Sequence, residues 1–190
     1  MIMAFGETDW TWLNPPRQWT ADDGLSLFCE PGTDLWRRTH YGYTYDTAHM
    51  FGRTLPGDLR LSVTFTGAYA EQYDQAGVVL RIDEQHWIKA GVEYVDGGFH
   101  LSTVVTREYS DWSVVPLAGT ARQVTFVLER AGDAVTVRYG LDAEPGETML
   151  RLAHFPPGRP ALAGAMAAAP VGKGFPVRFS DLRVSPLTAG

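Results

Sequence analysis

The sequence predicts an all-β domain, a two-sheet antiparallel jelly-roll sandwich that takes in residues 1–190. Short runs of alternating apolar and polar residues recur along the chain, and turn signals such as Asp96-Gly97 separate them. No segment has a convincing helical pattern. About ten short strands without helices favour a sandwich over a barrel or a parallel α/β fold.

The clearest strand signal lies at residues 59–66, where Leu59, Leu61, Val63 and Phe65 alternate with polar residues. This period of two is typical of a half-buried strand. Similar runs predict strands at residues 25–29, 76–83, 87–94, 99–106, 111–115, 124–130, 134–139 and 177–184. Residues 31–50 are less regular, and we expect a long ordered loop there, of the kind that carries function on a rigid scaffold.

Composition excludes several classes of partner. The net charge is −6 and the chain has no cluster of Lys and Arg, which argues against nucleic-acid binding. Residues 1–12 lack the basic region and apolar stretch of a signal peptide, and no apolar run approaches the ~20 residues that span a membrane. The single cysteine, Cys29, cannot form an intramolecular disulfide and is expected to be a small buried residue. We therefore expect a cytoplasmic protein; its oligomeric state stays open.

Residues 75–115 allow the strand register to be predicted. Ala76, Val78, Leu80 and Ile82 must face the same core as Ile88, Ala90 and Val92, because a slip of one residue would expose one set to water. With a loop of residues 84–86, this condition sets Arg81 opposite Lys89, Val79 opposite Gly91 and Gly77 opposite Glu93. The Asp96-Gly97 turn then sets Glu93 opposite His100, Gly91 opposite Ser102, Lys89 opposite Val104 and Trp87 opposite Thr106. A turn at residues 107–110 would place Val104 opposite Ser113, with Trp112 and Val114 pointing inward.

The predicted outer face has the features of a shallow pocket. Arg81 and Lys89 directly opposite one another would destabilise a sheet unless an anion or a polar ligand lay between or above them. Small residues form the adjacent row, and the indole of Trp87 offers a flat surface at one end. The alternative is a solvated sheet whose charges only aid solubility.

Several segments carry a family resemblance, including the run WIKAGVEY at residues 87–94. The others are residues 10–16, 33–42, 73–77, 79–83 and 104–113. In these segments the chain resembles the regulation-of-enolase domain family, which has a concanavalin A-like (lectin/glucanase) fold. The resemblance implies a jelly roll whose concave sheet holds a ligand, with the loop from Trp36 to Tyr41 at its edge. It adds Trp36, Arg37, His40, Tyr41 and Gln75 to the candidate ligand-binding residues.

Catalysis by two carboxyl groups is less well supported. Glycoside hydrolysis needs a pair about 5 to 10 Å apart. In the predicted register Glu93 and Asp83 lie ~20 Å apart along the sheet, at ~3.3 Å per residue. A loop acid, Asp34, Asp46 or Asp74, could instead partner Glu93. Glu93 beside His100 could orient a general base, but a simple cross-strand hydrogen bond on a polar face is the better explanation of that pair.

No cofactor is expected from the sequence. The five histidines show no paired ligand spacing, so no transition-metal site is predicted. Structural calcium held by loop carboxylates stays open for this fold class.

The prediction is therefore a binding protein for a polar small molecule, a saccharide or an anionic sugar derivative, on the concave sheet. Arg81, Lys89, Glu93, His100 and Ser102 would hydrogen-bond to it and Trp87 would stack on it. Two alternatives stay open. One is a carbohydrate-active hydrolase that uses Glu93 and a loop carboxylate, and the other is a regulatory module that binds a metabolic enzyme such as enolase.

Overall fold

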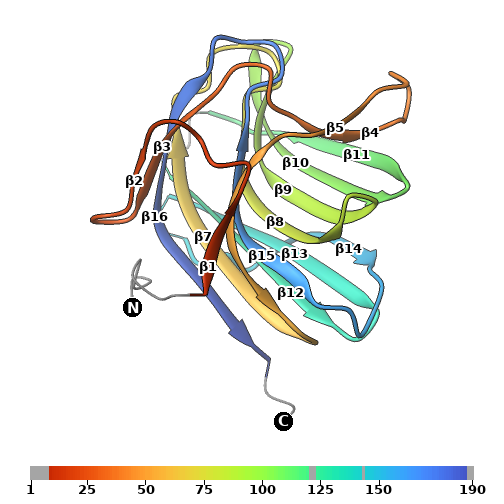
Figure 1. The fold of residues 1–190 in the computed structure, drawn as a ribbon. Coiled ribbons are helices and arrows are strands. Elements are labelled where there is room, and N and C mark those ends of the chain that lie inside the picture. Colours follow the sequence, from red (N-terminus) through yellow and green to blue (C-terminus); the bar gives the residue numbers. More distant parts are fainter. Residues whose placement is uncertain (1–8, 120–122, 143, 188–190) are drawn as a thin grey trace.

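The fold is described from a computed structural model that covers residues 9–119, 123–142 and 144–187. Two antiparallel seven-stranded sheets face each other (Figure 1), and no helix occurs in these ranges. The predicted all-β jelly-roll sandwich is confirmed. Most of the segment examined for a signal peptide, residues 1–8, lies outside the described ranges. Within them there is no helix that is long and apolar enough to span a membrane.

The first sheet has the strand order β1-β6-β15-β8-β9-β10-β11. Its members are β1 (Trp10–Leu13), β6 (His49–Leu55), β8 (Gln75–Asp83), β9 (His86–Val95), β10 (Gly98–Arg107), β11 (Tyr109–Pro116) and β15 (Ala161–Ala168). The second sheet has the order β14-β13-β12-β7-β16-β3-β2. Its members are β2 (Trp19–Thr20), β3 (Leu25–Cys29), β7 (Leu59–Gly67), β12 (Val124–Ala131), β13 (Ala134–Leu141), β14 (Thr148–His154) and β16 (Phe175–Pro186).

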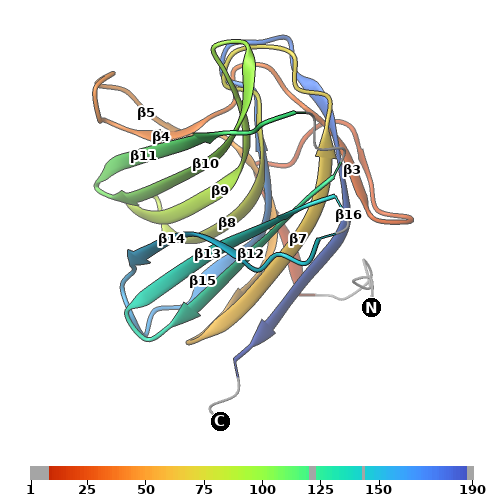
Figure 2. The same cartoon turned by 180° about the vertical axis from the view of Figure 1, so that it is seen from behind.

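The predicted loop at residues 31–50 contains a further hairpin. Its strands β4 (Leu35–Arg37) and β5 (Thr44–Asp46) pair with each other, and the segment ends in the first residues of β6. In Figures 1 and 2 the hairpin lies beside β11, on the inner side of the curve that β8–β11 describe. Asn14, which follows β1, fastens the base of the hairpin: its Nδ2 donates to the carbonyls of Asp46 (2.8 Å) and Ala48 (3.0 Å).

Two apolar clusters stabilise this arrangement. The larger fills the space between the sheets and includes Val63, Phe65, Val78 and Ile88. The smaller lies on the outer face of the first sheet, beneath the hairpin, and consists of Leu35, Trp36, Ala48, Met50, Val79, Trp87, Val104, Met166 and Ala168. The hairpin is thus attached to the sheet by apolar burial as well as by hydrogen bonds.

The β9–β10 register is as predicted, with Glu93 opposite His100 and Gly91 opposite Ser102. The β8–β9 register is two residues away from the prediction, so that Val79, and not Arg81, lies opposite Lys89. The reason is the turn. The carboxylate of Asp83 accepts the N–H of Gln85 (2.9 Å), which closes a tighter turn, and a bulge follows at residues 81–83. From Gln75 to Arg81, a shift of two residues keeps each side chain on its predicted face.

The predicted β10–β11 register was wrong by one residue. That error places each β11 side chain on the opposite face of the sheet. Glu108 alone forms the turn, with a φ of 65°, so Val104 pairs with Trp112 and not with Ser113. Trp112 and Val114 therefore lie on the outer face, contrary to the inward orientation predicted for them.

Two glycines allow the strands to approach closely at the floor of the outer face. Gly77 and Gly91 are directly opposite one another, and a Cβ at either would lie 2.0 Å from a backbone carbonyl oxygen of the neighbouring strand. Since backbone on both sides of the contact would have to move, neither site can accept a side chain without a shift of the strands.

Gly91→Ala is expected to lower the free energy of unfolding by about 1–3 kcal/mol, because overpacking forces the backbone apart. Gly98→Ala is the matched control: Gly98 is also a strand glycine, and its Cβ would meet only ordinary contacts beyond 3.7 Å. That variant should stay within about 0.5 kcal/mol of the parent. If urea unfolding showed an equal loss of unfolding free energy in the two variants, that result would contradict the close approach of the strands at Gly77 and Gly91.

Candidate functional site

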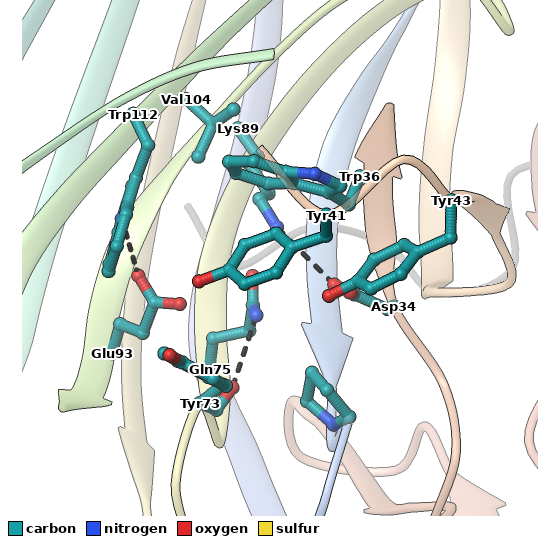
Figure 3. A pocket seen from close by; sticks show the side chains of 11 residues that line it. Asp34, Trp36, Tyr41, Tyr43, Tyr73, Gln75, Lys89, Glu93, Val104 and Trp112 are labelled. Carbon is teal, nitrogen blue, oxygen red and sulfur yellow. Dashed lines mark hydrogen bonds and ion pairs between the residues drawn. The ribbon is translucent and has the colours of Figure 1, made fainter. Parts of the chain in front are cut away.

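A pocket opens on the outer face of the first sheet, between β8–β11 and the β4–β5 hairpin (Figure 3). It encloses about 340 Å³, including its open mouth. Strands of the sheet supply its floor, while the hairpin and the loop before β8 supply its walls. The lining residues are Asp34, Trp36, Tyr41, Tyr43, Tyr73, Gln75, Lys89, Glu93, Val104, Trp112 and Pro170.

Aromatic rings form most of the wall. Trp36 meets Tyr41 edge-on at 5.6 Å between centroids and is nearly perpendicular to Trp112 at 6.4 Å. Tyr73 meets the same indole of Trp112 at 6.2 Å, and Tyr43 stacks on Tyr41 at 5.3 Å. These edge-to-face contacts hold the rings in fixed orientations around the pocket.

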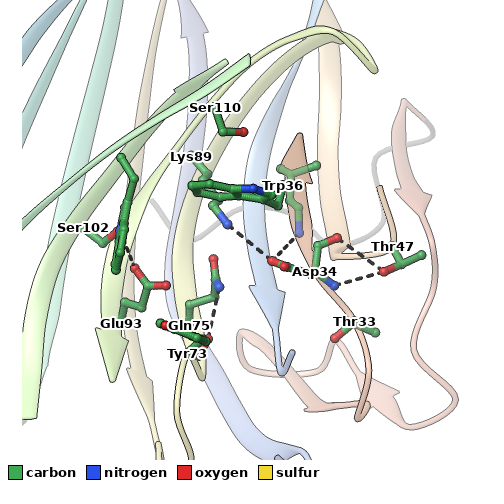
Figure 4. A network of polar contacts seen from close by, with 12 residues as sticks. Thr33, Asp34, Trp36, Thr47, Tyr73, Gln75, Lys89, Glu93, Ser102 and Ser110 are labelled. Atoms are coloured by element: carbon green, nitrogen blue, oxygen red, sulfur yellow. Dashed lines mark hydrogen bonds and ion pairs between the residues drawn. The ribbon is translucent and has the colours of Figure 1, made fainter. Parts of the chain in front are cut away.

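Buried polar groups form the floor. Lys89 and Glu93 are each only 5% exposed although both face the pocket. The Nζ of Lys89 lies 3.7 Å from Oδ1 of Asp34, and the Nε1 of Trp112 donates to both Glu93 (2.9 Å) and Ser102 (3.1 Å), as Figure 4 shows in part. Buried charges are expensive unless they are paired, so a floor that holds three of them calls for a functional explanation.

The pKa values of one floor group, Glu93, and one rim group, Tyr41, are raised. Desolvation raises the pKa of Glu93, and it outweighs the opposing effects of the Lys89 ammonium and of hydrogen bonds from Ser102 and Trp112. At the rim, a hydrogen bond with Tyr73 and, to a smaller extent, burial raise the pKa of Tyr41 to about 12. The Tyr41 hydroxyl is therefore neutral at physiological pH and links the hairpin to the loop before β8.

Three residues of the β4–β5 hairpin and of the loop before β8 have unusual backbone conformations. Tyr73, Arg38 and His40 have φ values of 68°, 62° and 63°, in the left-handed region that such residues seldom adopt. Backbone hydrogen bonds hold two of these residues in place. The N–H of Tyr73 donates to the carbonyl of Tyr94, and the N–H of Arg38 donates to the carbonyl of Tyr43, each at 2.7 Å. Strain of this kind persists where a site requires a particular side-chain position.

The structure brings six of the predicted residues together. Trp36, Tyr41, Gln75, Lys89 and Glu93 line the pocket, and Ser102 lines a small adjoining cavity together with Gly91 and Met166. The Nε2 of Gln75 donates to the carbonyl of Tyr73 (3.1 Å), which ties the floor to the strained loop.

The other predicted residues lie elsewhere. Trp87 is 1% exposed, with the Lys89 ammonium 5.9 Å above its ring, so it cannot stack on a ligand. Arg81 forms an ion pair with Asp46, away from Lys89, and His100 hydrogen-bonds to the carbonyl of Gly98 and not to Glu93.

Arg37 and His40 occupy the hairpin outside the pocket lining. The N–H of Arg37 donates to Oγ of Ser110 at 2.9 Å, and its side chain is buried. His40 is exposed and meets the ring of Tyr41 edge-on at 4.8 Å.

Six lining residues were not among the predicted ligand-binding residues. One is Asp34, which was considered only as a loop acid, and the others are Tyr43, Tyr73, Val104, Trp112 and Pro170. The sequence carries a signal for Tyr43, since Tyr41, Tyr43 and Tyr45 alternate with small residues in a period of two. Trp112 was missed because of the one-residue register error. Within the described ranges, no group of three or more His, Cys, Asp or Glu residues could hold a metal ion.

Glu93→Gln is expected to raise the free energy of unfolding at neutral pH. Because the folded-state pKa of Glu93 is raised, ionisation of this carboxyl removes stability as the pH rises from the unfolded pKa, about 4.3, through the folded pKa. Below the unfolded pKa the carboxyl is protonated in both states, so the advantage of the variant should vanish there.

Urea unfolding at neutral and acidic pH measures this difference, with the exposed Glu147→Gln as the matched control. Lower stability of Glu93→Gln at neutral pH would mean that the attraction to Lys89 exceeds the cost of burial.

Comparisons with known proteins place the fold and the family. The chain is 37% identical to "Regulation of enolase protein 1" of Saccharomyces cerevisiae over 172 residues, which cover 90% of this chain and 86% of that protein. A solved structure titled as a functionally unknown protein from the same yeast has a TM-score of 0.90 and 34% identity, and the match covers 96% of this chain and 98% of that one.

Two more distant structures resemble the fold alone. One is the xyloglucan-locus protein GH43B of Bacteroides ovatus, with 17% identity and a TM-score of 0.73, covering 95% of this chain and 37% of that one. The other is the carbohydrate-binding module CBM66 of Bacillus subtilis, with 12% identity and a TM-score of 0.59, covering 95% and 97%. A similar fold therefore occurs in a carbohydrate-binding module and in part of a GH43 chain. The family described as "Protein of unknown function (DUF1349)" matches residues 12–187, and the chain belongs to it.

Proposed function

We propose that the chain binds a neutral saccharide in the pocket beneath the β4–β5 hairpin. The observation that carries the proposal is the presence of a buried ammonium and a buried carboxylate, Lys89 and Glu93, on the same face of β9 at the floor of an aromatic-walled pocket. A sugar ring offers C–H faces to aromatic walls and hydroxyl groups to a polar floor, so it matches both surfaces.

Lys89 has hydrogen-bonding capacity to spare. It makes no hydrogen bond with any described residue, and its nearest charged partner, Asp34, is 3.7 Å away. An ammonium has three donors, so hydroxyl oxygens of a ligand could accept from it.

Glu93 supplies the complementary acceptor. One of its oxygens accepts from Trp112, and the other points toward the middle of the pocket (Figure 3). Neighbouring hydroxyls of one sugar ring could accept from Lys89 and donate to Glu93, and hydrogen bonds to charged groups are the stronger ones.

The charges favour a neutral sugar over the anionic derivative predicted from the sequence. That prediction depended on Arg81 opposite Lys89, and Arg81 is instead paired with Asp46. In the pocket a single cation, Lys89, faces two acids, Asp34 and Glu93. A carboxylate or phosphate on the ligand would meet no unopposed positive charge.

Glu93→Gln and Lys89→Met are each expected to weaken saccharide binding about tenfold or more, because each leaves a hydrogen bond to a charged group unmade. The measurement is calorimetric titration with cello-, xylo-, malto- and manno-oligosaccharides and their parent monosaccharides, together with a uronic acid. Glu147→Gln should bind as the parent does. Absence of binding throughout this set, or tightest binding of the uronic acid, would contradict the proposal.

Hydrolysis is supported less well. Among the loop acids weighed as partners of Glu93, only Asp34 lines the pocket: Asp46 is paired with Arg81, and Asp74 is fully buried, accepting from the N–H groups of Ala70 and Glu71. Lys89 acts electrostatically on Glu93 and also pairs with Asp34. Both acids therefore interact with one ammonium. Glycoside hydrolysis instead uses an acid and a nucleophile that have separate environments, so this arrangement suits binding better than hydrolysis.

Regulation of an enolase by direct contact is the second candidate, because a relative 37% identical to this chain bears that name. We expect a mixture of the purified chain and the enolase of the same organism to form a complex in analytical ultracentrifugation and to change the enolase rate. Independent sedimentation with an unchanged enolase rate would contradict direct regulation. A cytoplasmic location, which either function would suit, stays a prediction.

A further inference from the structure

A row of three tyrosines extends from the pocket along the β4–β5 hairpin. Tyr41 stacks on Tyr43 with centroids 5.3 Å apart and an interplanar angle of 13°, and Tyr43 meets Tyr45 at 5.0 Å. The first two line the pocket and the third does not. The row therefore begins at the saccharide pocket and continues beyond it.

The exposure of these rings calls for an explanation. Tyr41, Tyr43 and Tyr45 are 43%, 40% and 43% exposed, and they are consecutive members of one aromatic surface. Scattered exposed apolar residues are ordinary, whereas a contiguous aromatic patch usually marks a binding surface. The hairpin could retain its attachment to the sheet without them, since Leu35 and Trp36 make its contacts with the apolar cluster below.

The chemistry of the row identifies its occupant. The rings present apolar faces with hydroxyl groups at their tips and no charge of their own, as a neutral sugar requires. Tyr41 and Tyr43 are nearly parallel, whereas Tyr43 and Tyr45 meet at an interplanar angle of 69°, so the row offers rings in two orientations.

We propose that the ligand is an oligosaccharide, with one unit in the pocket and the following units lying along Tyr43 and Tyr45. This inference rests on the proposed function and extends it from a single sugar to a chain. It makes the hairpin the element that determines the preferred chain length.

Chain-length dependence tests the inference. For the cello-, xylo-, malto- or manno-series that binds, we expect affinity to rise from the mono- to the tri- or tetrasaccharide. Tyr45→Ala should weaken binding of the longer chain about 3- to 10-fold and leave the monosaccharide unchanged, because the lost ring contacts only the added units. Tyr45→Phe, which keeps the ring, should bind the longer chain as the parent does.

Leu152→Ala is the matched control, since Leu152 is an exposed apolar residue on β14 of the other sheet and its truncation should change neither affinity. Equal affinity for mono- and tetrasaccharide, or an unchanged longer-chain affinity of Tyr45→Ala, would overturn the extended site while leaving the single-sugar pocket intact. Failure of every series to bind would overturn the pocket and the extended site together.

Discussion

The contact between the β4–β5 hairpin and the outer face of the first sheet is the constraint on which the candidate site depends. Leu35 and Trp36 reach down to Trp87, Val104 and Met166, so the sheet is covered over part of a face that would otherwise meet water. The covering excludes solvent from Lys89 and Glu93 without closing the space above them. A jelly roll without this cluster would have a polar sheet surface and no pocket.

The electrostatics of the pocket follow from that burial. Desolvation has the largest effect on the pKa of Glu93 and raises it. The Lys89 ammonium and the hydrogen bonds from Ser102 and Trp112 lower that pKa, but they do not cancel the effect of desolvation. An arrangement that costs stability and is held by strained loop residues is more readily explained by binding than by folding. The protein thus retains a carboxylate that a purely structural sheet would replace with an apolar side chain.

The fold could be predicted from the sequence because apolar and polar residues alternate regularly along many of its strands. The strand β7, with one face in the core, alternates strictly between buried and more exposed residues, and both β7 and β12 were predicted nearly to their ends. The strands β6 and β15 were missed because they are buried on both faces for much of their length, so the alternation disappears. The hairpin was missed because its strands are only three residues long.

The site was predictable only in part, for a geometric reason. Lys89, Glu93 and Ser102 were placed on the correct face because a tight Asp-Gly turn determines the β9–β10 register. Trp112 was placed on the wrong face because the one-residue turn at Glu108 has no comparable signal. The pocket walls formed by Tyr43 and Tyr73 depend on contacts between segments that are distant in the sequence. The alternation of apolar and polar residues does not predict such contacts.

Asn14 connects the pocket to the beginning of the described chain. It holds the carbonyls of Asp46 and Ala48 at the base of the hairpin, although neither it nor β1 contributes a side chain to the pocket lining. The edge strand β1 and the residue after it therefore fix the position of the hairpin. A tag, fusion or proteolytic cut that loosened β1 would release the hydrogen bonds of Asn14 at the base of the hairpin, as well as the packing of Trp10 and Trp12 against the core.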